Sequence, residues 1–160
     1  MIRPLTTVKK EMRTLGLDGC NPKRIIGVVV RGGYFLDGVV LFENKSGNSL
    51  GTQIVNIPYY PELRCIMLHD QTNRLKTTSI EPQTGLPLIK VTNHSNSSRK
   101  ETMVSVRKRG RLSVKTKLPT STLEKILGLT WTIGRLPEPV RVAHLLARAQ
   151  VFHKPLQDKP

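Results

Sequence analysis

Short apolar runs separated by turn residues occupy the first part of the chain. Residues 12–17 form one such run and end at an Asp-Gly pair. Residues 24–30, rich in Ile and Val, form a second run, and residues 34–42 form a third after the Arg31-Gly32-Gly33 turn. Runs of this length and composition predict β-strands, and the glycine turn predicts that the second and third strands form a hairpin.

The next segment alternates between helical and strand-like patterns. Residues 50–57 predict a short helix that ends before Pro58, and residues 63–68 and 87–91 predict two buried strands. The pattern of the intervening residues 69–79 is ambiguous. Strands separated by helical segments are typical of an α/β sheet.

The second half of the chain begins with a polar stretch, residues 93–98, which predicts a loop. Apolar and polar residues then alternate over residues 104–106 and 112–114, on either side of a strongly basic segment. Gly110 can supply the turn between them. This arrangement predicts a β-hairpin with a basic tip.

Two helices are expected near the C-terminus. Residues 123–127 predict the first, with Ser121 as its cap, Glu124 completing a capping box and Gly128 ending it. The second opens at Pro137 and carries an apolar side and a basic side.

The chain is expected to fold as one α/β domain with two extensions. Residues 1–11 predict a basic arm that is disordered on its own. Residues 12–151 predict the domain, with the basic loop and hairpin over residues 93–118. Residues 152–160 predict an extended tail.

The balance of charge points to a polyanionic partner. The 160 residues include 26 Lys and Arg against 11 Asp and Glu, a formal net charge of +15. A compact domain with this charge repels itself unless an anion neutralises it, and phosphate backbones do so with release of counterions. A merely solubilising surface needs less charge, and no basic amphipathic helix with a bulky aromatic face indicates a membrane surface. Nucleic acid is therefore the expected partner.

The basic residues of the arm, the strands, the hairpin and the last helix are the expected contacts with phosphate. They are Arg3, Lys9, Lys10, Arg13, Lys23, Arg24, Arg31, Arg99, Lys100, Arg107, Lys108, Arg109, Arg111, Lys115, Lys117, Arg135, Arg141, Arg148 and Lys154. With one Trp, three Tyr and three Phe, the chain offers few rings for stacking single-stranded bases. Recognition of compact RNA by shape and phosphate contacts fits this composition better.

The cysteines do not indicate a metal centre. Cys20 and Cys65 are the two cysteines, no Cys-x-x-Cys occurs, and the four histidines are scattered. Cys65 lies within an apolar run and is expected to be a buried thiol. We therefore expect no metal, no cofactor and no disulfide. The apolar runs are too short to span a membrane, and the N-terminus lacks the pattern of a signal peptide, so a cytosolic location is expected.

Several stretches together resemble a known family. They are residues 26–39 (IGVVVRGGYFLDGV), 15–18 (LGLD), 137–147 (PEPVRVAHLLA), 63–68 and 85–91. These stretches resemble the archaeal endonuclease-dU-like family, which is related to endonuclease V. The resemblance implies an RNase-H-like fold, a mixed sheet with helices on its faces, in which several carboxylates hold Mg²⁺ for phosphodiester hydrolysis.

The acidic positions of that family are largely lost here. Where the family's first strand ends Asp-Asp-Gly, this chain has Asp18 followed by Gly and Cys. Ser46 and Ser49 stand in place of the two acids of the family's Asp-Gly-x-Asp loop. His69 stands at the acid that ends a later strand, where Asp70 could compensate by a shift of one residue.

Three further positions bear on this comparison. Ser79 replaces another family acid, with Lys76 nearby. Asp37 is expected to be structural, in a turn or at a sheet edge. His144, within the matched helix, could contact nucleic acid or belong to the rim of the ancestral site, but we favour a histidine packed between helix and sheet.

Loss of acids together with gain of bases predicts a nuclease scaffold that binds without cutting, and no catalytic residue is assigned. We expect an RNA-binding protein, with ribosomal RNA in an archaeal ribosome and neighbouring ribosomal proteins as its setting. Two alternatives remain: a Mg²⁺-dependent endonuclease on deaminated nucleic acid, and a non-catalytic DNA-binding accessory protein.

Overall fold

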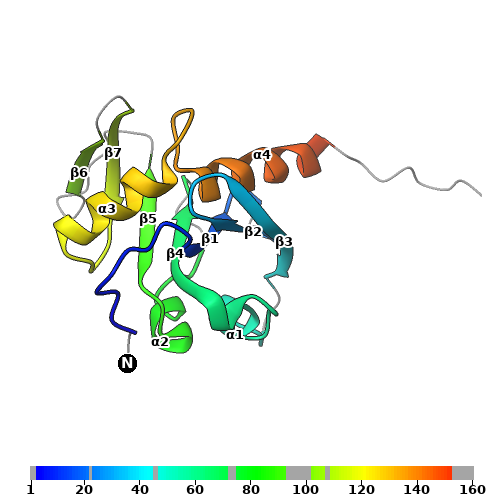
Figure 1. Ribbon diagram of the computed structural model, residues 1–160. Helices are drawn as coiled ribbons and strands as arrows, with labels where there is room; N and C mark the ends of the chain where they lie inside the picture. The colour runs from blue at the N-terminus through cyan, green and yellow to red at the C-terminus, as the bar shows by residue number, and fades with distance from the viewer. Residues whose placement is uncertain are drawn as a thin grey trace, which may run out of the picture.

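The computed structural model describes residues 3–21, 23–44, 47–71, 75–92, 102–106 and 109–152. Its centre is a seven-stranded mixed sheet with the order β3-β2-β1-β4-β5-β7-β6 (Figure 1). The strands are β1 (Arg13–Asp18), β2 (Arg24–Arg31), β3 (Phe35–Glu43), β4 (Leu63–His69), β5 (Leu88–Thr92), β6 (Thr102–Val106) and β7 (Gly110–Lys115). The helices are α1 (Leu50–Val55), the 3₁₀ turn η1 (Tyr60–Glu62), α2 (Ile80–Thr84), α3 (Thr120–Thr130) and α4 (Glu138–Phe152).

Strands β1, β4 and β5 form the parallel centre of the sheet. β1 pairs with β4, and β4 with β5, in parallel, whereas β2 and β3 form the predicted antiparallel hairpin beside β1. β6 and β7 form the second predicted hairpin, and β7 joins it to the sheet by pairing antiparallel with β5. Both hairpins predicted from the sequence are thus confirmed.

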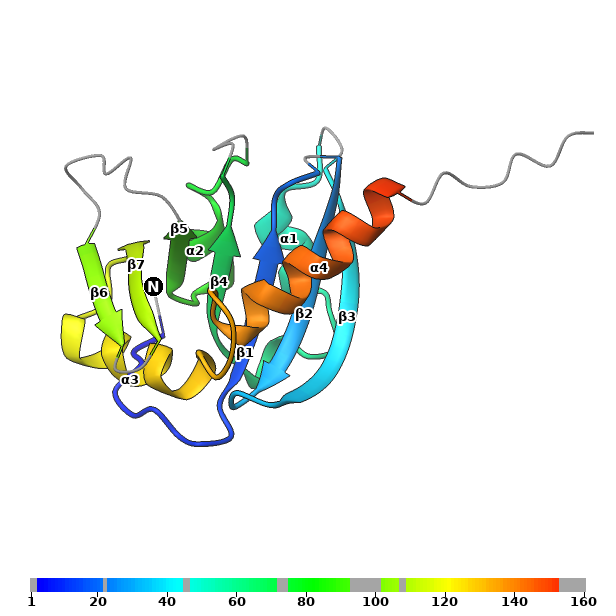
Figure 2. The ribbon, with the colours of Figure 1, turned by 90° about the horizontal axis from the view of Figure 1, so that it is seen from above.

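Helices cover the two faces of the sheet unequally. On one face, α3 packs across β5, β7 and β6, and α4 crosses β1 and β2 (Figures 1 and 2). On the other face, α1 and α2 pack on the apolar side of β1 and β4, where Ile54 and Ile80 are fully buried. Burial of these side chains is the main source of stability, because apolar area removed from water contributes about 25 cal/mol per Å².

Gly16 sets how closely α4 approaches the sheet. A Cβ at this position would overlap the carbonyl group and ring of Pro139, in the first turn of α4. The absence of a side chain on β1 therefore lets the helix backbone lie directly on the strand. This contact fixes where the following turns of α4 lie relative to the end of β1.

Three expectations about the termini and helix ends are wrong. The segment expected to be a disordered arm is packed, since Leu5 lies in the core and the Arg3 amide donates to Gly85 O at 2.6 Å. α3 begins at Thr120, so Ser121 lies inside the helix and no side chain caps it. The helix also continues through Gly128, because Leu127 and Thr130 are buried against the sheet and packing outweighs the helix propensity of glycine.

The short helix α2 and the turn η1 were not predicted. Both are five residues or fewer, too short for a helical period to show in the sequence. The predicted polar loop over residues 93–98 lies outside the described residues, and so does the predicted tail over residues 152–160 except Phe152, which ends α4.

Two glycine substitutions should have opposite effects on stability. Gly16→Ala is expected to lower the free energy of unfolding by about 1–3 kcal/mol, because the new methyl group forces α4 off the sheet. Gly128→Ala is the control: nothing lies within 4 Å of the added Cβ, and alanine favours a helix over glycine by about 1 kcal/mol, so this variant should be more stable. Urea unfolding of both variants measures the difference, and equal stability would contradict the close approach at Gly16.

Candidate functional site at the ends of β1 and β4

The parallel pairing of β1 and β4 brings Asp18 and His69 together. The two residues are register partners at the last positions of their strands, and both side chains are fully buried. The Gly19 amide donates to His69 O at 3.0 Å, which extends the pairing beyond the strand ends. The sequence comparison placed these residues at family acid positions, and the structure brings them into one site.

Asp18 is the centre of a four-residue polar cluster, which consists of Asp18, Cys20, His69 and His144. Asp18 Oδ2 lies 3.1 Å from His69 Nδ1 and 2.8 Å from His144 Nδ1. The Cys20 amide donates to Asp18 Oδ1 at 2.9 Å, and Cys20 Sγ lies 3.5 Å from His144 Nδ1. Two imidazoles and one thiol therefore converge on a single carboxylate.

The histidines approach this carboxylate from different elements. His69 comes from β4 and His144 from α4, and their rings meet edge to face with centroids 5.0 Å apart. His69 Nε2 is buried and has no hydrogen-bond partner within the described residues. His144 and Cys20 are half-buried, so the cluster is reached from solvent on their side. His144 therefore lies between helix and sheet, as we favoured, with its Nδ1 2.8 Å from Asp18 Oδ2, and it is also a member of the polar cluster.

The cluster perturbs the protonation of its members. Burial acts to raise the pKa of Asp18, but hydrogen bonds from His69, Cys20 and His144 together outweigh it and lower the pKa to about 2. Burial, reinforced by the Asp18 carboxylate, raises the pKa of the Cys20 thiol to about 12. Asp18 is thus ionised at neutral pH, and Cys20 is a thiol rather than a reactive thiolate.

The Mg²⁺ that the fold family implies does not suit these donors. Mg²⁺ requires an octahedral shell of oxygen atoms, usually from carboxylates, water and phosphate. Here Asp18 is the one carboxylate in the cluster, beside two imidazole nitrogens and a sulfur. Asp70, expected to compensate, is buried, and its Oδ2 accepts a hydrogen bond from the Leu75 amide at 3.0 Å.

Two other positions of the family comparison have structural roles, one lies outside the described residues, and Ser79 stands at the start of α2 with no side-chain hydrogen bond that caps the helix. Ser49 caps α1 by accepting from the Thr52 amide. Asp37 binds Arg13 at 2.6 Å and Arg31 at 3.4 Å, so its predicted structural role is confirmed. Ser46 is not among the described residues.

The predicted phosphate contacts fall into distinct groups. Arg99, Lys100, Arg107, Lys108 and Lys154 lie outside the described residues. Four others form ion pairs with acidic side chains: Arg13, Arg31, Lys117 and Arg141. Arg3 lies over the Tyr60 ring and donates to its hydroxyl. The remaining nine form no ion pair with any described acid: Lys9, Lys10, Lys23, Arg24, Arg109, Arg111, Lys115, Arg135 and Arg148.

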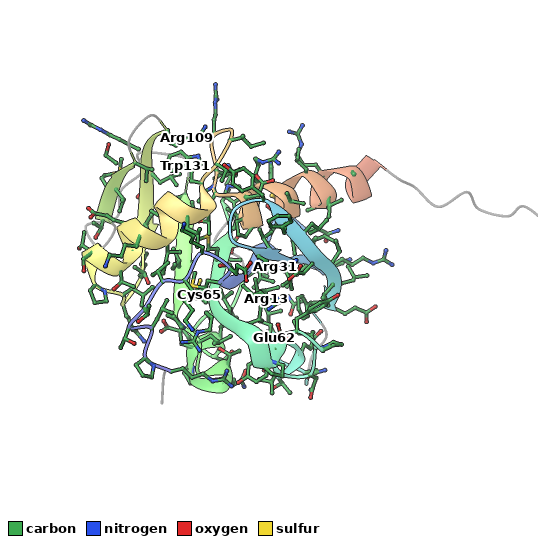
Figure 3. All side chains as sticks on the ribbon, viewed as in Figure 1. Arg13, Arg31, Glu62, Cys65, Arg109 and Trp131 are labelled. Carbon is green, nitrogen blue, oxygen red and sulfur yellow. The ribbon has the colours of Figure 1, made fainter. Side chains whose placement is uncertain are left out.

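The engaged and unengaged cations lie in different places. Figure 3 shows Arg13, Arg31 and Glu62 near one another beside β1 and β2, where Arg13 also pairs with Glu62. Arg109 lies apart from them, at the turn of the β6–β7 hairpin. Arg13 and Arg31 therefore hold neighbouring strands together, whereas Arg109 forms no ion pair with a described acid.

One sheet face carries Arg111 and Lys115, two of the cations that form no ion pair with a described acid. On β7, Leu112 and Val114 point into the core beneath α3, so the alternate residues Arg111, Ser113 and Lys115 share the opposite face. Lys90 on β5 is the register partner of Lys115. We call the side of β5, β7 and β6 opposite α3 the basic sheet face.

A groove of about 370 Å³ borders this face near α2. Lys90, Lys115 and Lys117 line it together with threonine hydroxyls. Within the groove, Lys117 pairs with Glu81 at 2.7 Å. Glu81 also lines the groove, and the Thr116 hydroxyl donates to Leu88 O at 2.8 Å, so Lys115 is the lysine of this groove without an ion pair to a described acid.

Comparison with known proteins places the chain in a family. No family model matches the sequence. The chain is 31% identical over 183 residues to a UPF0215 protein of Methanopyrus kandleri, with 89% of this chain and 93% of that protein covered. It is 30% identical over 178 residues to a UPF0215 protein of Methanosarcina mazei, with 88% and 91% covered. The chain belongs to the UPF0215 family.

Solved structures show that this UPF0215 protein has the RNase-H-like fold that the family resemblance implied. A protein of unknown function from Archaeoglobus fulgidus superposes with a TM-score of 0.70 at 21% identity, covering 89% of this chain and 99% of that one. Endonuclease V of Bacillus subtilis superposes with a TM-score of 0.55 at 13% identity, covering 94% of this chain and 86% of that one. Argonaute of Marinitoga piezophila, solved with guide RNA and target DNA, superposes with a TM-score of 0.56 at 11% identity. The match covers 88% of this chain and 30% of that one.

Sequence reasoning missed Cys20 as a member of the site and did not predict that the cluster exists. Its members lie in three segments with no common spacing, because Asp18 and Cys20 are two positions apart and Asp18 and His144 are 126 positions apart. The signal that could have found them was the family alignment, which placed Asp18 and His69 at the same sheet edge. No described helix has both the length and the apolar character needed to cross a membrane.

The low pKa of Asp18 should make stability fall in acid. The folded pKa of about 2 lies below the unfolded value of about 3.9, so the ionised carboxylate stabilises the fold fully above pH 5 and progressively less as the pH falls towards 2. The full contribution is about 2–3 kcal/mol, and about half of it should be gone at pH 3. Asp18→Asn should lack this loss, which urea unfolding at pH 5 and pH 3 in the presence of a chelator would measure. Glu124→Gln, an exposed site on α3, is the control and should follow the parent protein; an equal loss in Asp18→Asn would contradict the assignment.

Proposed function

We propose that this protein binds structured nucleic acid, with RNA preferred, and does not cleave it by the Mg²⁺-dependent chemistry of RNase-H-like nucleases. The net charge of +15 carries the binding part of the proposal, and the pairing of Asp18 with His69 at the ends of β1 and β4 carries the absence of cleavage. A nuclease of this fold needs converging carboxylates at that edge, and here imidazoles and a thiol surround the one carboxylate of the cluster.

The surface charge supports binding. The net charge of +15 is not spread evenly, because several acids are engaged with arginine, lysine or histidine inside the fold. Among the described basic residues, Arg109, Arg111, Lys115 and Arg148 form no ion pair with a described acid. Phosphate contacts from such a surface would fix the orientation of a folded nucleic acid without reading its sequence.

We do not propose the ribosome as the setting of this binding. None of the relatives and structural neighbours named above is described as a ribosomal protein, so the expected setting in an archaeal ribosome has no support from them. An endonuclease on deaminated nucleic acid and a DNA-binding accessory protein are the outcomes that the following experiments distinguish from RNA binding.

The basic sheet face can be tested by charge reversal. The double variant Arg111→Glu and Lys115→Glu is expected to bind a structured RNA at least about tenfold more weakly, because two phosphate contacts are lost. The slope of log affinity against log salt should also fall by about 1–2 units. Fluorescence anisotropy across a salt series, with a structured RNA and a DNA duplex as ligands, measures both quantities.

The matched control makes the same change in net charge elsewhere. Arg64→Glu with Lys125→Glu alters two exposed residues on β4 and α3, outside the predicted contacts. This control should keep most of the affinity and the slope. Equal weakening in both double variants would mean that only the total charge matters, and tighter binding of the duplex would favour the DNA-binding alternative.

The absence of nuclease chemistry is tested by a cleavage assay. The purified protein with Mg²⁺ should leave RNA and DNA containing inosine or uracil intact, because the Mg²⁺ ligands are missing. Gel electrophoresis of end-labelled substrates measures the product. Cleavage that requires Mg²⁺ and disappears in Asp18→Ala would overturn this part of the proposal and leave the binding part standing.

A further inference from the structure

The polar cluster around Asp18 has the composition and spacing of a transition-metal site. One donor atom from each of Asp18, Cys20, His69 and His144 lies within 4.8 Å of every other. The closest separations are 2.8, 3.1 and 3.5 Å. The edges of a tetrahedron around Zn²⁺ are about 3.3–3.8 Å for bonds of about 2.0–2.3 Å, so small adjustments would complete the geometry.

We propose that Asp18, Cys20, His69 and His144 together bind a Zn²⁺ ion, or another divalent transition metal, in a structural site. Two imidazoles, one thiolate and one carboxylate are the ligand types that Zn²⁺ takes in proteins, whereas Mg²⁺ takes oxygen. Four protein ligands leave no position for a reactive water, which fits a structural rather than a catalytic ion.

The charges balance when the ion binds. Asp18 is already ionised, and each imidazole binds as a neutral ring that carries its proton on the nitrogen not bound to the ion. The Cys20 thiol loses its proton as the Zn–S bond forms, so one proton is released to solvent for each ion bound. The carboxylate and the thiolate then neutralise the two positive charges of Zn²⁺. A neutral site avoids the large cost of burying an uncompensated ion at the strand ends.

A catalytic Cys-His-Asp relay is the competing interpretation, and the geometry disfavours it. In such a relay the cysteine and the acid contact different nitrogens of the histidine ring, so that a proton can pass from one side to the other. Here Cys20 Sγ and Asp18 Oδ2 both approach Nδ1 of His144. Convergence on one nitrogen is expected when the groups point towards a common centre.

The scaffold would hold the ligands in place. Asp18 and His69 are fixed by the pairing of two central strands, and the contact of Pro139 with Gly16 positions the helix that carries His144. Cys20 follows Asp18 by two residues and is tied to it through its own amide. Because His144 and Cys20 are half-buried, an ion can arrive from solvent without unfolding of the sheet.

Titration of the metal-depleted protein tests this proposal. Zn²⁺, added in competition with a chromophoric chelator, should bind with one ion per chain and release about one proton, and millimolar Mg²⁺ should not compete. Co²⁺ as the probe should give visible absorption typical of tetrahedral coordination and a near-ultraviolet band from the thiolate. Zn²⁺ should also raise the melting temperature of the protein.

Variants of single residues show whether the polar cluster, rather than other side chains of the protein, binds the ion. Cys20→Ala should abolish the thiolate band, and His144→Ala should weaken Zn²⁺ binding by at least about 100-fold. His144→Ala keeps a good helix former on α4, so it should remain folded, which circular dichroism checks. Cys65→Ala is the matched control: it removes the other thiol, buried in the core, and should retain the band and the affinity.

Two results would overturn the proposal. One is that the parent protein binds no stoichiometric Zn²⁺ or Co²⁺. The other is that binding persists unchanged in both Cys20→Ala and His144→Ala, which would place the ion elsewhere on the chain. Neither result depends on whether the protein binds nucleic acid.

Discussion

The parallel pairing of β1 with β4 determines where the functional groups of this molecule lie. It is the register of these two strands that sets Asp18 beside His69, and it is the bare backbone at Gly16 that lets α4 bring His144 to the same point. A slip of one residue in that register would turn Asp18 to the opposite face of the sheet. The site is therefore a property of the sheet centre and not of a loop.

Charge is distributed by the same framework. Acids such as Asp18, Asp37 and Glu81 are engaged with cationic or imidazole partners within the fold, and in this way they hold elements together. The cations in excess remain on the outside. A protein with the same composition but randomly placed charges would not develop a basic face, so the fold concentrates the net charge as well as containing it.

The fold was largely predictable because its strands are short, apolar and bounded by turn residues. The two hairpins followed from alternation and from glycine positions, and both were found. Gly128 was misread because burial of the neighbouring Leu127 outweighs local helix preference, and Leu5 was misread because core contacts across the chain are invisible to composition. The site was predicted only in part: the family comparison located Asp18 and His69, but the approach of His144 depends on a helix crossing that no local pattern encodes. Cys20 follows Asp18 by two residues, and its role became visible only from the bond of its amide to the Asp18 carboxylate.

The anchoring of α4 at Gly16 has a mechanical consequence. A helix of 15 residues behaves as a stiff rod, and the contact at Pro139 lies near one end of it. His144 is about 7.5 Å along the rod from that contact and Arg148 is about 13.5 Å along it, at a rise of about 1.5 Å per residue. A tilt of α4 about its anchor therefore displaces Arg148 nearly twice as far as His144, so a fraction of an ångström of movement at the buried cluster is amplified where a cation meets solvent.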